Sequence, residues 1–294
     1  MAVSWALISG ASTGIGRAVA MQLLSEGFHV IAGVRSPAAA DRLRQQAATI
    51  KSASLETTTL DVTDQSSIDA AVAHAAELSG PDGLRAVINN AGIGVPGPLE
   101  HLTPSDWRRQ FDVNFFGAID LTRATLPLLR RAVAAHGRGV PRLLFISSIG
   151  GRIAQPLMAP YTCSKFALSA LGDSLRLELR PQGIGVTVIE PGAIATDIWS
   201  KGQDSAADYT PDHPARKLYS REIEGLIALA QKAASNAIPA EKAAEEVVHT
   251  ITAARAPARV LIGQDAKIAA RLKSLLPTSV FDNILAKQFG IPKQ

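Results

Sequence analysis

Short apolar runs alternate with longer amphipathic stretches through residue 190. The runs have the length and the Val, Ile and Leu content of buried strands, and they cover 3–9, 28–34, 55–60, 84–89, 143–147 and 185–190. Between them, apolar residues recur at helical spacing, as at Ile15, Val19 and Leu23. They predict a helix that ends before Gly27 and further helices over 41–49, 64–78, 105–135 and 161–179. Strands and helices that alternate in this way indicate an α/β fold, a doubly wound parallel sheet with helices on both faces.

Beyond the sixth run the pattern loosens. It predicts a polar loop over 201–214, helices over 215–234 and 240–254, and a last strand over 258–263. We expect a single domain over 1–294, with 197–240 as an insert beside the substrate and 265–294 as an amphipathic C-terminal extension. Pro127 falls inside 105–135, and because the apolar pattern resumes after it, we expect the proline to kink that helix and not to end it.

The composition narrows the class of protein. The 294 residues are 47% hydrophobic and 19% charged, which excludes an intrinsically disordered chain. The one cysteine, Cys163, cannot form an internal disulfide, so we expect a reducing, cytoplasmic location. The net charge of +4 (30 Lys and Arg against 26 Asp and Glu) is spread along the chain, which does not favour a nucleic acid partner. No run reaches the roughly eighteen apolar residues that a membrane-spanning helix needs.

A cluster of small residues follows the first predicted strand. From Ser9 the chain reads S-G-A-S-T-G-I-G, and a predicted helix follows directly. Small residues there let backbone N–H groups approach a pyrophosphate, and the helix directs its positive end at that anion. An ordinary tight turn also uses glycines. The position after the first strand of a parallel sheet nevertheless favours a dinucleotide site of Rossmann type, formed by Gly10, Ser12, Thr13, Gly14, Ile15 and Gly16.

The end of the second predicted strand distinguishes NAD from NADP. An acidic residue there would bind the ribose 2′-hydroxyl, whereas an arginine can bind a 2′-phosphate. The chain has Arg35 and Ser36 at this position and no acid before Asp41. A solvated surface arginine is the alternative interpretation. Beside a nucleotide site we favour the phosphate role, and we therefore predict NADP(H) as the cofactor.

Tyr161 and Lys165 lie four residues apart on one face of a predicted helix, near its start. An ammonium group at that distance favours the phenolate and is expected to lower the pKa of the tyrosine, which suits a phenol for acid–base catalysis. Ser148 ends the preceding strand and could hydrogen-bond to a substrate oxygen. Each of these features alone also occurs without function, because tyrosine and lysine often pair on exposed helices.

The combination of motifs resembles the short-chain dehydrogenase/reductase family over nearly the whole chain. The motifs that match in order and spacing are Ser9 to Gly16, Asp61-Val62, Asn89-Asn90-Ala91-Gly92, Asn114, Ser147-Ser148, Tyr161 to Lys165, and Pro191-Gly192 with Thr196. One residue departs from the family's usual pattern, because Ser9 stands where threonine is common. The hydroxyl group is retained there.

The resemblance implies an oxidoreductase and a role for each motif. Tyr161 would be the general acid in reduction and the general base in oxidation, and Lys165 would also hold the nicotinamide ribose. Ser148 would polarise the substrate carbonyl, and Asn114 would anchor a water that connects the site to solvent. The remaining motifs would border the parts of the cofactor. Asp61 and Val62 would border the adenine, and Asn90, Ala91 and Gly92 the adenosine ribose. The nicotinamide would be bordered by Pro191, Gly192, Ile194 and Thr196.

The resemblance is nearest to retinol, hydroxysteroid and hydroxybutyrate dehydrogenases, as at 173–179 and 190–194, and it implies an apolar alcohol or carbonyl substrate. Residues that could line the pocket, with core packing an equal alternative for each, are Val95, Gln155, Leu157, Met158, Ile198 and Trp199. The polar loop could order over a substrate. Two other functions stay open: an NADP-binding regulatory protein, and an epimerase or dehydratase that retains its cofactor on the same scaffold.

The C-terminal extension has an apolar face and a basic face, the latter formed by Lys267, Arg271, Lys273 and Lys287. Such a helix can lie on an anionic membrane, but packing on its own domain or on a second subunit is favoured. The family resemblance implies a homodimer or homotetramer formed through 105–135 and 161–179. Cys163 has no histidine near it in sequence, which predicts a small buried residue and not a nucleophile. The six histidines lack metal-ligand spacing, so no metal is predicted.

Overall fold

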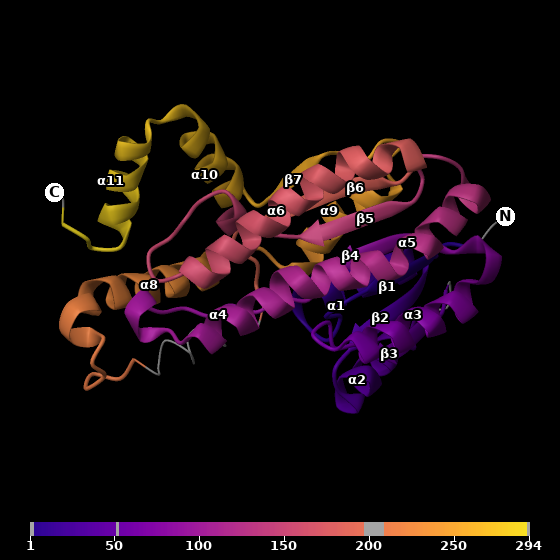
Figure 1. Cartoon of the computed structure of the whole chain (residues 1–294), viewed down its shortest axis with the longest axis horizontal. Helices are drawn as coiled ribbons and strands as arrows, with labels where there is room; N and C mark the ends of the chain where they lie inside the picture. The colour runs from indigo at the N-terminus through magenta and orange to yellow at the C-terminus, as the bar shows by residue number, and fades with distance from the viewer. Residues whose placement is uncertain (1–2, 51–52, 197–208, 293–294) are drawn as a thin grey trace.

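The protein is described here by a computed structural model that covers residues 3–50, 53–196 and 209–292. Its centre is a seven-stranded parallel sheet in the order β3-β2-β1-β4-β5-β6-β7 (Figure 1). The strands are β1 (Trp5–Ile8), β2 (His29–Val34), β3 (Leu55–Thr59), β4 (Leu84–Asn89), β5 (Arg142–Ile146), β6 (Gly185–Pro191) and β7 (Arg259–Ile262). The doubly wound parallel sheet that the sequence predicts is confirmed.

Helices cover both faces of the sheet. One face carries α1 (Gly14–Ser25), α2 (Pro37–Ala47) and α9 (Ala240–Thr252), and the other carries α3 (Gln65–Ser79), α5 (Gly117–His136) and α6 (Ala159–Leu179). The alternation of side chains along β1 explains the two layers. Ala6 and Ile8 belong to the first core, whereas Trp5 and Leu7 belong to the second. All four are buried because a parallel strand between two helix layers has no solvent face.

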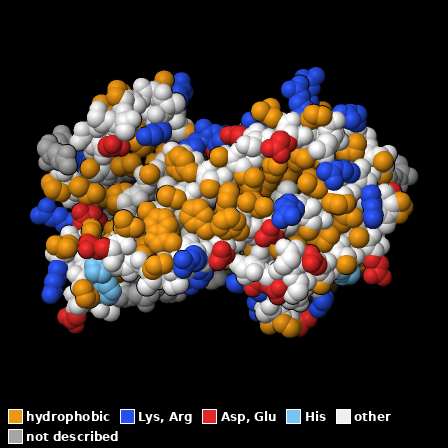
Figure 2. Space-filling model, in the orientation of Figure 1, with side chains coloured by type: hydrophobic (Ala, Val, Ile, Leu, Met, Phe, Trp, Pro, Cys, Tyr) orange, Lys and Arg blue, Asp and Glu red, His pale blue; other side chains and the backbone are white. Residues whose placement is uncertain are grey.

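Large apolar side chains are exposed on α6 and at the residue just before α5. Phe116 precedes α5, and Phe166 and Leu177 lie on α6, with exposed fractions of 50%, 41% and 65%. Phe166 and Leu177 are separated by about three helical turns, so they share one side of the helix. Figure 2 shows a band of apolar side chains across the middle of this view, where Figure 1 places α4 (Pro104–Phe111), α5 and α6. We refer to these three residues as the α5/α6 apolar face.

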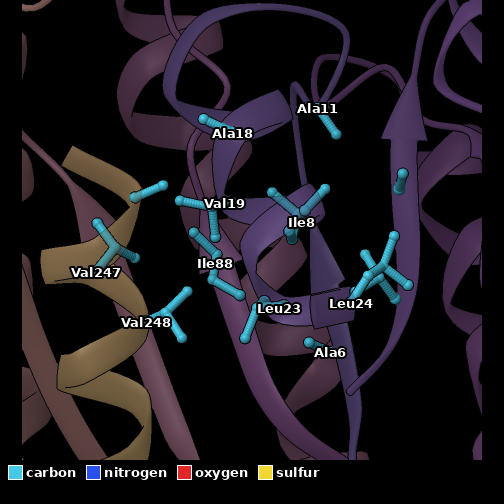
Figure 3. Close-up of a cluster of buried hydrophobic side chains, with 14 of the residues drawn as sticks. Ala6, Ile8, Ala11, Ala18, Val19, Leu23, Leu24, Ile88, Val247 and Val248 are labelled. Carbon is cyan, nitrogen blue, oxygen red and sulfur yellow. The ribbon is translucent and has the colours of Figure 1, made fainter. Parts of the chain in front are cut away.

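The first core joins segments that are far apart in sequence. Val247 and Val248 of α9 lie in one cluster with Val19 and Leu23 of α1 and with Ile8 of β1 (Figure 3). Each of these side chains is buried. Burial of this kind is the main favourable contribution to folding, and it holds α1 and α9 against β1.

The stretch 105–135 is helical throughout, but not α-helical throughout. After α4 the chain forms a π-helical segment, η3 (Asp112–Phe116), and α5 then continues through Pro127 to His136. A helix that continues past the proline agrees with the sequence pattern, and the change of helix type lies at η3. A π segment changes the helical register by about one residue, which is too small a change to be seen in the apolar pattern.

The C-terminal extension packs on its own domain. It consists of α10 (Gln264–Leu275) and α11 (Thr278–Gln288), and Phe281 and Phe289 are buried. A Cβ atom at Gly225 of α8 (Arg216–Asn236) would lie 2.6 Å from the carbonyl oxygen of Phe289, so α8 touches the end of the extension. Ile268 and Leu275 of α10 remain exposed. None of the described helices is both long and apolar enough to cross a membrane.

Candidate active site

The sequence-predicted site residues gather at one edge of the sheet. The glycine loop follows β1, Asn90 to Gly92 follow β4, Ser148 follows β5, and Pro191 ends β6. The strand order changes direction between β1 and β4, and ligands of open α/β sheets bind in the crevice at such a point. The fold therefore brings residues that are spread over about 180 positions to one crevice.

Glycines are required in the loop after β1. Gly10 and Gly14 have φ angles of +66° and +56°, which L side chains rarely adopt. A Cβ atom at Gly10 would lie 2.9 Å from Ala91 Cα, and one at Gly14 would lie 2.9 Å from Thr196 Cγ2. Small residues thus allow this loop to approach the segments that follow β4 and β6.

Asn90 holds the glycine loop in place. Its Nδ2 donates hydrogen bonds to the carbonyl oxygens of Ser9 and Gly10, at 3.0 and 2.9 Å. The hydroxyl oxygen of Ser9 accepts in return from the N–H groups of Asn90 and Ala91, both at 3.1 Å. Gly16 lies directly against the Asn90 amide and has no room for a Cβ atom. The Asn90 side chain is therefore engaged by the loop itself, a structural role that the sequence motif did not reveal.

The start of α1 offers an anion site. Thr13 is the N-cap residue, and in the described part of the chain its side chain caps no N–H group of the helix. The first N–H groups of α1 consequently remain available, together with the positive end of the helix dipole. Ser12 and Ile15 lie half-buried beside them. This cradle of glycines and free N–H groups fits the pyrophosphate of a dinucleotide.

Arg35 and Ser36 lie where the sequence predicts, directly after β2. Arg35 is exposed, and within the described residues its guanidinium has no ion-pair partner. Ser36 caps α2 by accepting a hydrogen bond from the Ala39 N–H at 3.3 Å, which leaves its hydroxyl hydrogen for another acceptor.

Asp61 and Val62 follow β3. Asp61 Oδ1 accepts hydrogen bonds from the N–H and the hydroxyl of Thr63, at 3.0 and 2.7 Å. Val62 is buried, and it lies so close to Gly117 that a Cβ atom there would be 2.7 Å from its Cγ2. Their predicted contacts with the adenine stay a prediction.

Tyr161 stands in the first turn of α6, with its ring between two glycines. A Cβ atom at Gly150 would lie 3.1 Å from Tyr161 Cε1, and one at Gly94 would lie 3.8 Å from Cδ2. Lys165 is one turn further along, with its Nζ 5.9 Å from the centroid of the tyrosine ring. The same Nζ donates a hydrogen bond to the carbonyl oxygen of Ile146 at 2.8 Å. The structure thus brings the tyrosine and the lysine together as predicted.

Burial controls the protonation of this pair. Burial raises the pKa of Tyr161, and a hydrogen bond with Ser148 opposes that rise. Burial lowers the pKa of Lys165 to about 8. The sequence-based expectation of a lowered pKa for Tyr161 is therefore wrong in direction, because desolvation of the phenolate outweighs the favourable interactions. Near neutral pH Tyr161 is therefore a protonated phenol.

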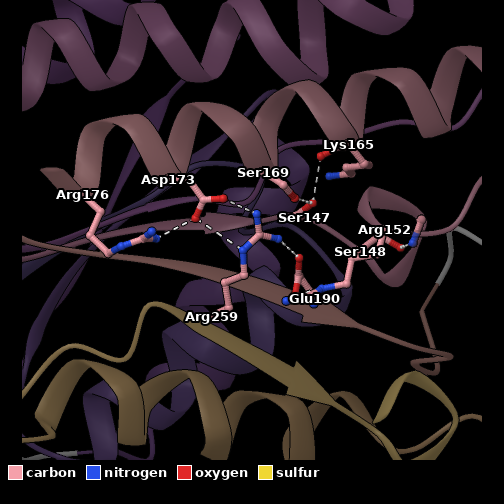
Figure 4. Close-up of polar contacts among 10 residues, drawn as sticks. Ser147, Ser148, Arg152, Lys165, Ser169, Asp173, Arg176, Glu190 and Arg259 are labelled. Atoms are coloured by element: carbon pink, nitrogen blue, oxygen red, sulfur yellow. Dashed lines mark hydrogen bonds and ion pairs between the residues drawn. The ribbon is translucent and has the colours of Figure 1, made fainter. Parts of the chain in front are cut away.

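Ser148 caps the short helix η4 (Ile149–Gly151). Its Oγ accepts a hydrogen bond from the Gly150 N–H at 3.0 Å, so its own hydrogen can be donated to another oxygen. The preceding residue, Ser147, donates from its Oγ to the carbonyl oxygen of Lys165 at 3.2 Å (Figure 4). The turn that carries Ser148 is thereby attached to the helix that carries Tyr161.

Asn114 lies buried in η3 and faces the segment after β4. Its Oδ1 accepts from the Ile93 N–H at 2.8 Å, and its Nδ2 donates to the Ile93 carbonyl oxygen and to Ser164 Oγ, at 3.0 and 3.1 Å. Gln110, which sequence reasoning missed, makes a similar clamp. Its Nε2 donates to the same carbonyl oxygen and its Oε1 accepts from the Val95 N–H, both at 2.8 Å. The only sequence signal for Gln110 is a polar residue on the buried side of a helix.

Gly92 lies beside both Asn114 and Lys165. A Cβ atom at Gly92 would lie 3.4 Å from Asn114 Oδ1 and 3.5 Å from Lys165 Nζ. The predicted cofactor-binding and catalytic positions therefore border one another at this point.

A carboxylate that the sequence did not single out supports the segment after β6. Asp265, at the start of α10, accepts a hydrogen bond from the Ala193 N–H at 2.7 Å and lies directly against Gly192. Ile194 is buried, and Thr196 covers Gly14 as described above. The segment that is predicted to border the nicotinamide is thus held by the C-terminal extension.

The predicted substrate residues divide into three groups. Gln155 is exposed. Leu157 and Met158 are half-buried and lie just before α6. Val95 is buried, and its N–H is engaged by Gln110. Ile198 and Trp199 lie outside the described residues.

Cys163 is exposed, so the predicted burial of this side chain is wrong. Residue 163 lies between Tyr161 and Lys165 in sequence, but two residues along a helix turn a side chain to a different face.

Among the described residues, no three His, Cys, Asp or Glu side chains are grouped as a metal site.

Comparison with known proteins identifies the family. Residues 4–207 match the family described as short chain dehydrogenase. This chain belongs to that family, and it is an oxidoreductase with a nucleotide-binding fold of Rossmann type.

Similar proteins span nearly the whole chain. The "Uncharacterized oxidoreductase YusZ" of Bacillus subtilis is 34% identical over 285 residues, which are 96% of this chain and 97% of that protein. Retinol dehydrogenase 5 of Mus musculus is 35% identical over 98% of this chain and 89% of its own length. A solved short-chain dehydrogenase from Streptomyces avermitilis has a TM-score of 0.74 at 26% identity, and the similarity covers 98% of this chain and 95% of that chain.

Proposed function

We propose that this protein uses NADP(H) to interconvert an apolar secondary alcohol, of the retinol or steroid kind, and the corresponding carbonyl compound. The observation that carries the proposal is the convergence of Ser148, Tyr161 and Lys165 beside the dinucleotide cradle. The nicotinamide, when bound, supplies or accepts the hydride. The protein's own residues bind, orient and move the proton.

Tyr161 is the proton donor to the carbonyl oxygen in reduction. Its raised pKa keeps the phenol protonated near neutral pH, which is the form that reduction needs. Ser148 donates its hydroxyl hydrogen toward the same oxygen, because its Oγ is already an acceptor for the Gly150 N–H. Lys165 is an ammonium ion below a pH of about 8, and it stabilises the phenolate that remains after proton transfer. Asn114 anchors the path to solvent.

NADP(H) is proposed on the basis of Arg35. An exposed arginine without a carboxylate partner among the described residues, at the end of β2, is suited to a 2′-phosphate. A protein 29% identical over 96% of this chain is named NADPH-dependent 3-dehydrocapnine reductase, from Ornithobacterium rhinotracheale. A dehydrogenase from Burkholderia phymatum with a similar fold (TM-score 0.77) was solved with NAD, so the fold alone does not favour either cofactor.

An apolar substrate is supported by Leu157 and Met158, which lie half-buried just before the helix that carries Tyr161. The relative named retinol dehydrogenase 5 has an apolar alcohol in its name. We propose that the 197–240 insert, in its described part from residue 209, shapes access to this side of the site, with Val95 and Gln155 as further lining residues.

We also propose that two copies associate through the α5/α6 apolar face. Exposed large apolar side chains on neighbouring helices are typical of protein interfaces. A homodimer, or a homotetramer built from it, would bury this face.

The test is a screen of apolar ketones and aldehydes with NADPH or NADH, paired with the reverse screen of alcohols. We expect one NADPH to be consumed per carbonyl reduced, and Tyr161→Phe to lower kcat by about 10²- to 10⁴-fold without changing the Kd for NADPH. Binding of NADPH without consumption would indicate a regulatory protein. Substrate conversion with no net change in NADPH would indicate an epimerase or dehydratase. Either result would contradict the proposal.

A further inference from the structure

Glu190 is a fully buried carboxylate on β6, with an exposed fraction of 0%. Its Oε2 accepts a hydrogen bond from Arg152 Nε at 2.6 Å, and its Oε1 accepts from Arg259 Nη1. Arg259 also pairs with Asp173 of α6, and it lies between the two carboxylates in Figure 4. A charge at this depth is stable only when its partners compensate for the lost hydration, so the geometry of these ion pairs is strongly constrained.

Arg152 is the residue directly after η4, and backbone hydrogen bonds connect it to Ser148. The Arg152 N–H donates to the Ile149 carbonyl oxygen at 2.9 Å, and the Gly151 N–H donates to the Ser148 carbonyl oxygen at 2.8 Å. Arg152 and Ser148 are thus joined through the backbone of a single 3₁₀ turn.

The opposite end of the turn is fixed by Ser147. Its N–H donates to the carbonyl oxygen of Ile189 on β6 at 2.8 Å, and its Oγ lies 2.9 Å from Ser169 Oγ on α6. A Cβ atom at Gly151 would lie 2.7 Å from both of these hydroxyl oxygens, so the turn is in close contact with α6. The turn is thus held against β6 through Ser147 and against α6 through Ser147 and Gly151. The Arg152–Glu190 ion pair holds its carboxyl end.

We propose that the Arg152–Glu190 ion pair positions Ser148 for catalysis. It attaches the carboxyl end of η4 to β6 and so fixes Ser148 Oγ relative to the Tyr161 phenol. Arg152 is a positioning residue, because it acts through Ser148. The inference rests on the proposed function, in which Ser148 and Tyr161 act on the substrate oxygen.

The test compares Arg152→Met with Arg176→Met in the full-length protein. Arg152→Met keeps the length of the side chain and removes the ion pair with Glu190. Arg176→Met is the matched control, because it removes the 2.6 Å ion pair to Asp173 in the same network without touching η4. The first measurement is hydrogen exchange of the backbone amides of residues 150–153, which does not require turnover. We expect exchange there to be faster by about tenfold or more in Arg152→Met and unchanged in Arg176→Met.

The second measurement is the pH profile of alcohol oxidation, which needs the Tyr161 phenolate. A less ordered Ser148 stabilises the phenolate less, so Arg152→Met should move the midpoint upward by about half a pH unit or more. It should also lower kcat about tenfold with the Kd for NADP(H) unchanged. Arg152→Lys should recover part of both effects, because it retains a cation opposite Glu190, and it serves as the second variant where Arg152→Met does not fold. Arg176→Met should stay within about twofold of the wild-type kcat.

Two results would overturn the inference. One is an Arg152→Met protein with wild-type exchange at residues 150–153 and a wild-type pH profile. The other is an equal loss in both arginine variants, which would show a general effect of the network on stability. In either case NADPH-dependent turnover by the wild-type protein would leave the proposed function intact. Conversely, faster exchange at these amides in a protein that reduces no carbonyl would support the anchoring of Ser148 and contradict the proposed function.

Discussion

Asn114 and the backbone of Ile93 exchange two hydrogen bonds, one accepted by Asn114 Oδ1 at 2.8 Å and one donated by its Nδ2 at 3.0 Å. The same Nδ2 lies 3.1 Å from Ser164 Oγ on α6. One side-chain amide therefore connects the segment after β4, the π-helical turn and the helix of Tyr161. An amide suits this arrangement because its oxygen accepts one hydrogen bond while its nitrogen donates two.

Replacement of Asn114 by Asp should show whether these hydrogen bonds affect activity beyond their effect on the stability of the fold. An ionised carboxylate still accepts from the Ile93 N–H, but it has no hydrogen to donate to Ile93 or Ser164. We expect a loss of about 1–3 kcal/mol in the free energy of unfolding by urea, together with a lower kcat. Gln110→Glu is the control, because it removes a donor to the same Ile93 carbonyl oxygen, and the hydrogen bonds of Gln110 within the described residues go to Ile93 and Val95 and not to α6. Equal losses of activity at equal stability would show that Asn114 acts only through the fold.

Arg35→Asp should change the cofactor preference. A carboxylate at the end of β2 repels a 2′-phosphate and can accept a hydrogen bond from a 2′-hydroxyl. We expect the ratio of kcat/KM for NADPH to that for NADH to fall at least tenfold, which corresponds to about 1.4 kcal/mol. Arg42→Asp makes the same charge change at an exposed position of α2 and should leave the ratio unchanged. An unchanged ratio in Arg35→Asp would show that Arg35 does not recognise the phosphate.

Lys165 should make stability depend on pH in the alkaline range. Its pKa is about 8 in the folded protein and 10.5 as the ordinary value. Between these pH values the unfolded chain holds a proton that folded Lys165 has lost, so this residue's contribution to the free energy of unfolding rises with pH. Below pH 8 the buried ammonium is at its most unfavourable. Across the window the rise amounts to about 3 kcal/mol.

Lys165→Met removes this titration. The free energy of unfolding of Lys165→Met minus that of the wild type should be greatest below pH 8 and should fall by up to about 3 kcal/mol by pH 10.5. The variant should also lose activity. Urea denaturation at pH 7 and pH 10 measures the difference. Lys267→Met, at an exposed position of α10, should show no such trend. A constant difference between wild type and Lys165→Met would mean that the folded-state pKa of Lys165 is not lowered.

Phe166→Glu should disrupt the proposed dimer. A charge placed in the centre of an apolar interface loses its hydration without gaining a partner, and we expect the dimer Kd to rise by about 10²-fold or more. Sedimentation equilibrium across a concentration series measures this change. Ile268→Glu introduces the same charge at an exposed apolar residue of α10, outside the α5/α6 apolar face. Dissociation in Ile268→Glu alone would place the interface on the C-terminal extension.

Local features of the site could be predicted because the residues that form them lie close together in the sequence. The glycines at positions 10 and 14 are needed for a turn with positive φ, and Tyr161 and Lys165 are one helical turn apart. The polar clamp of Gln110 could not be predicted, because its partners are backbone groups of Ile93 and Val95 that no side-chain pattern marks. The exposure of Cys163 was also missed.

The sequence by itself determined the alternation of strands and helices, the dinucleotide loop, the tyrosine–lysine pair and the family. These properties depend on backbone preferences and on spacings of two to four residues, and both are visible in a linear pattern. Only the tertiary structure decided the ion pair of Arg152 with Glu190, the support of Gly192 by Asp265, and the direction in which the pKa of Tyr161 is shifted. Those depend on which distant segments meet and on how completely the packed chain excludes water, since desolvation depends on three-dimensional surroundings and not on neighbours in sequence.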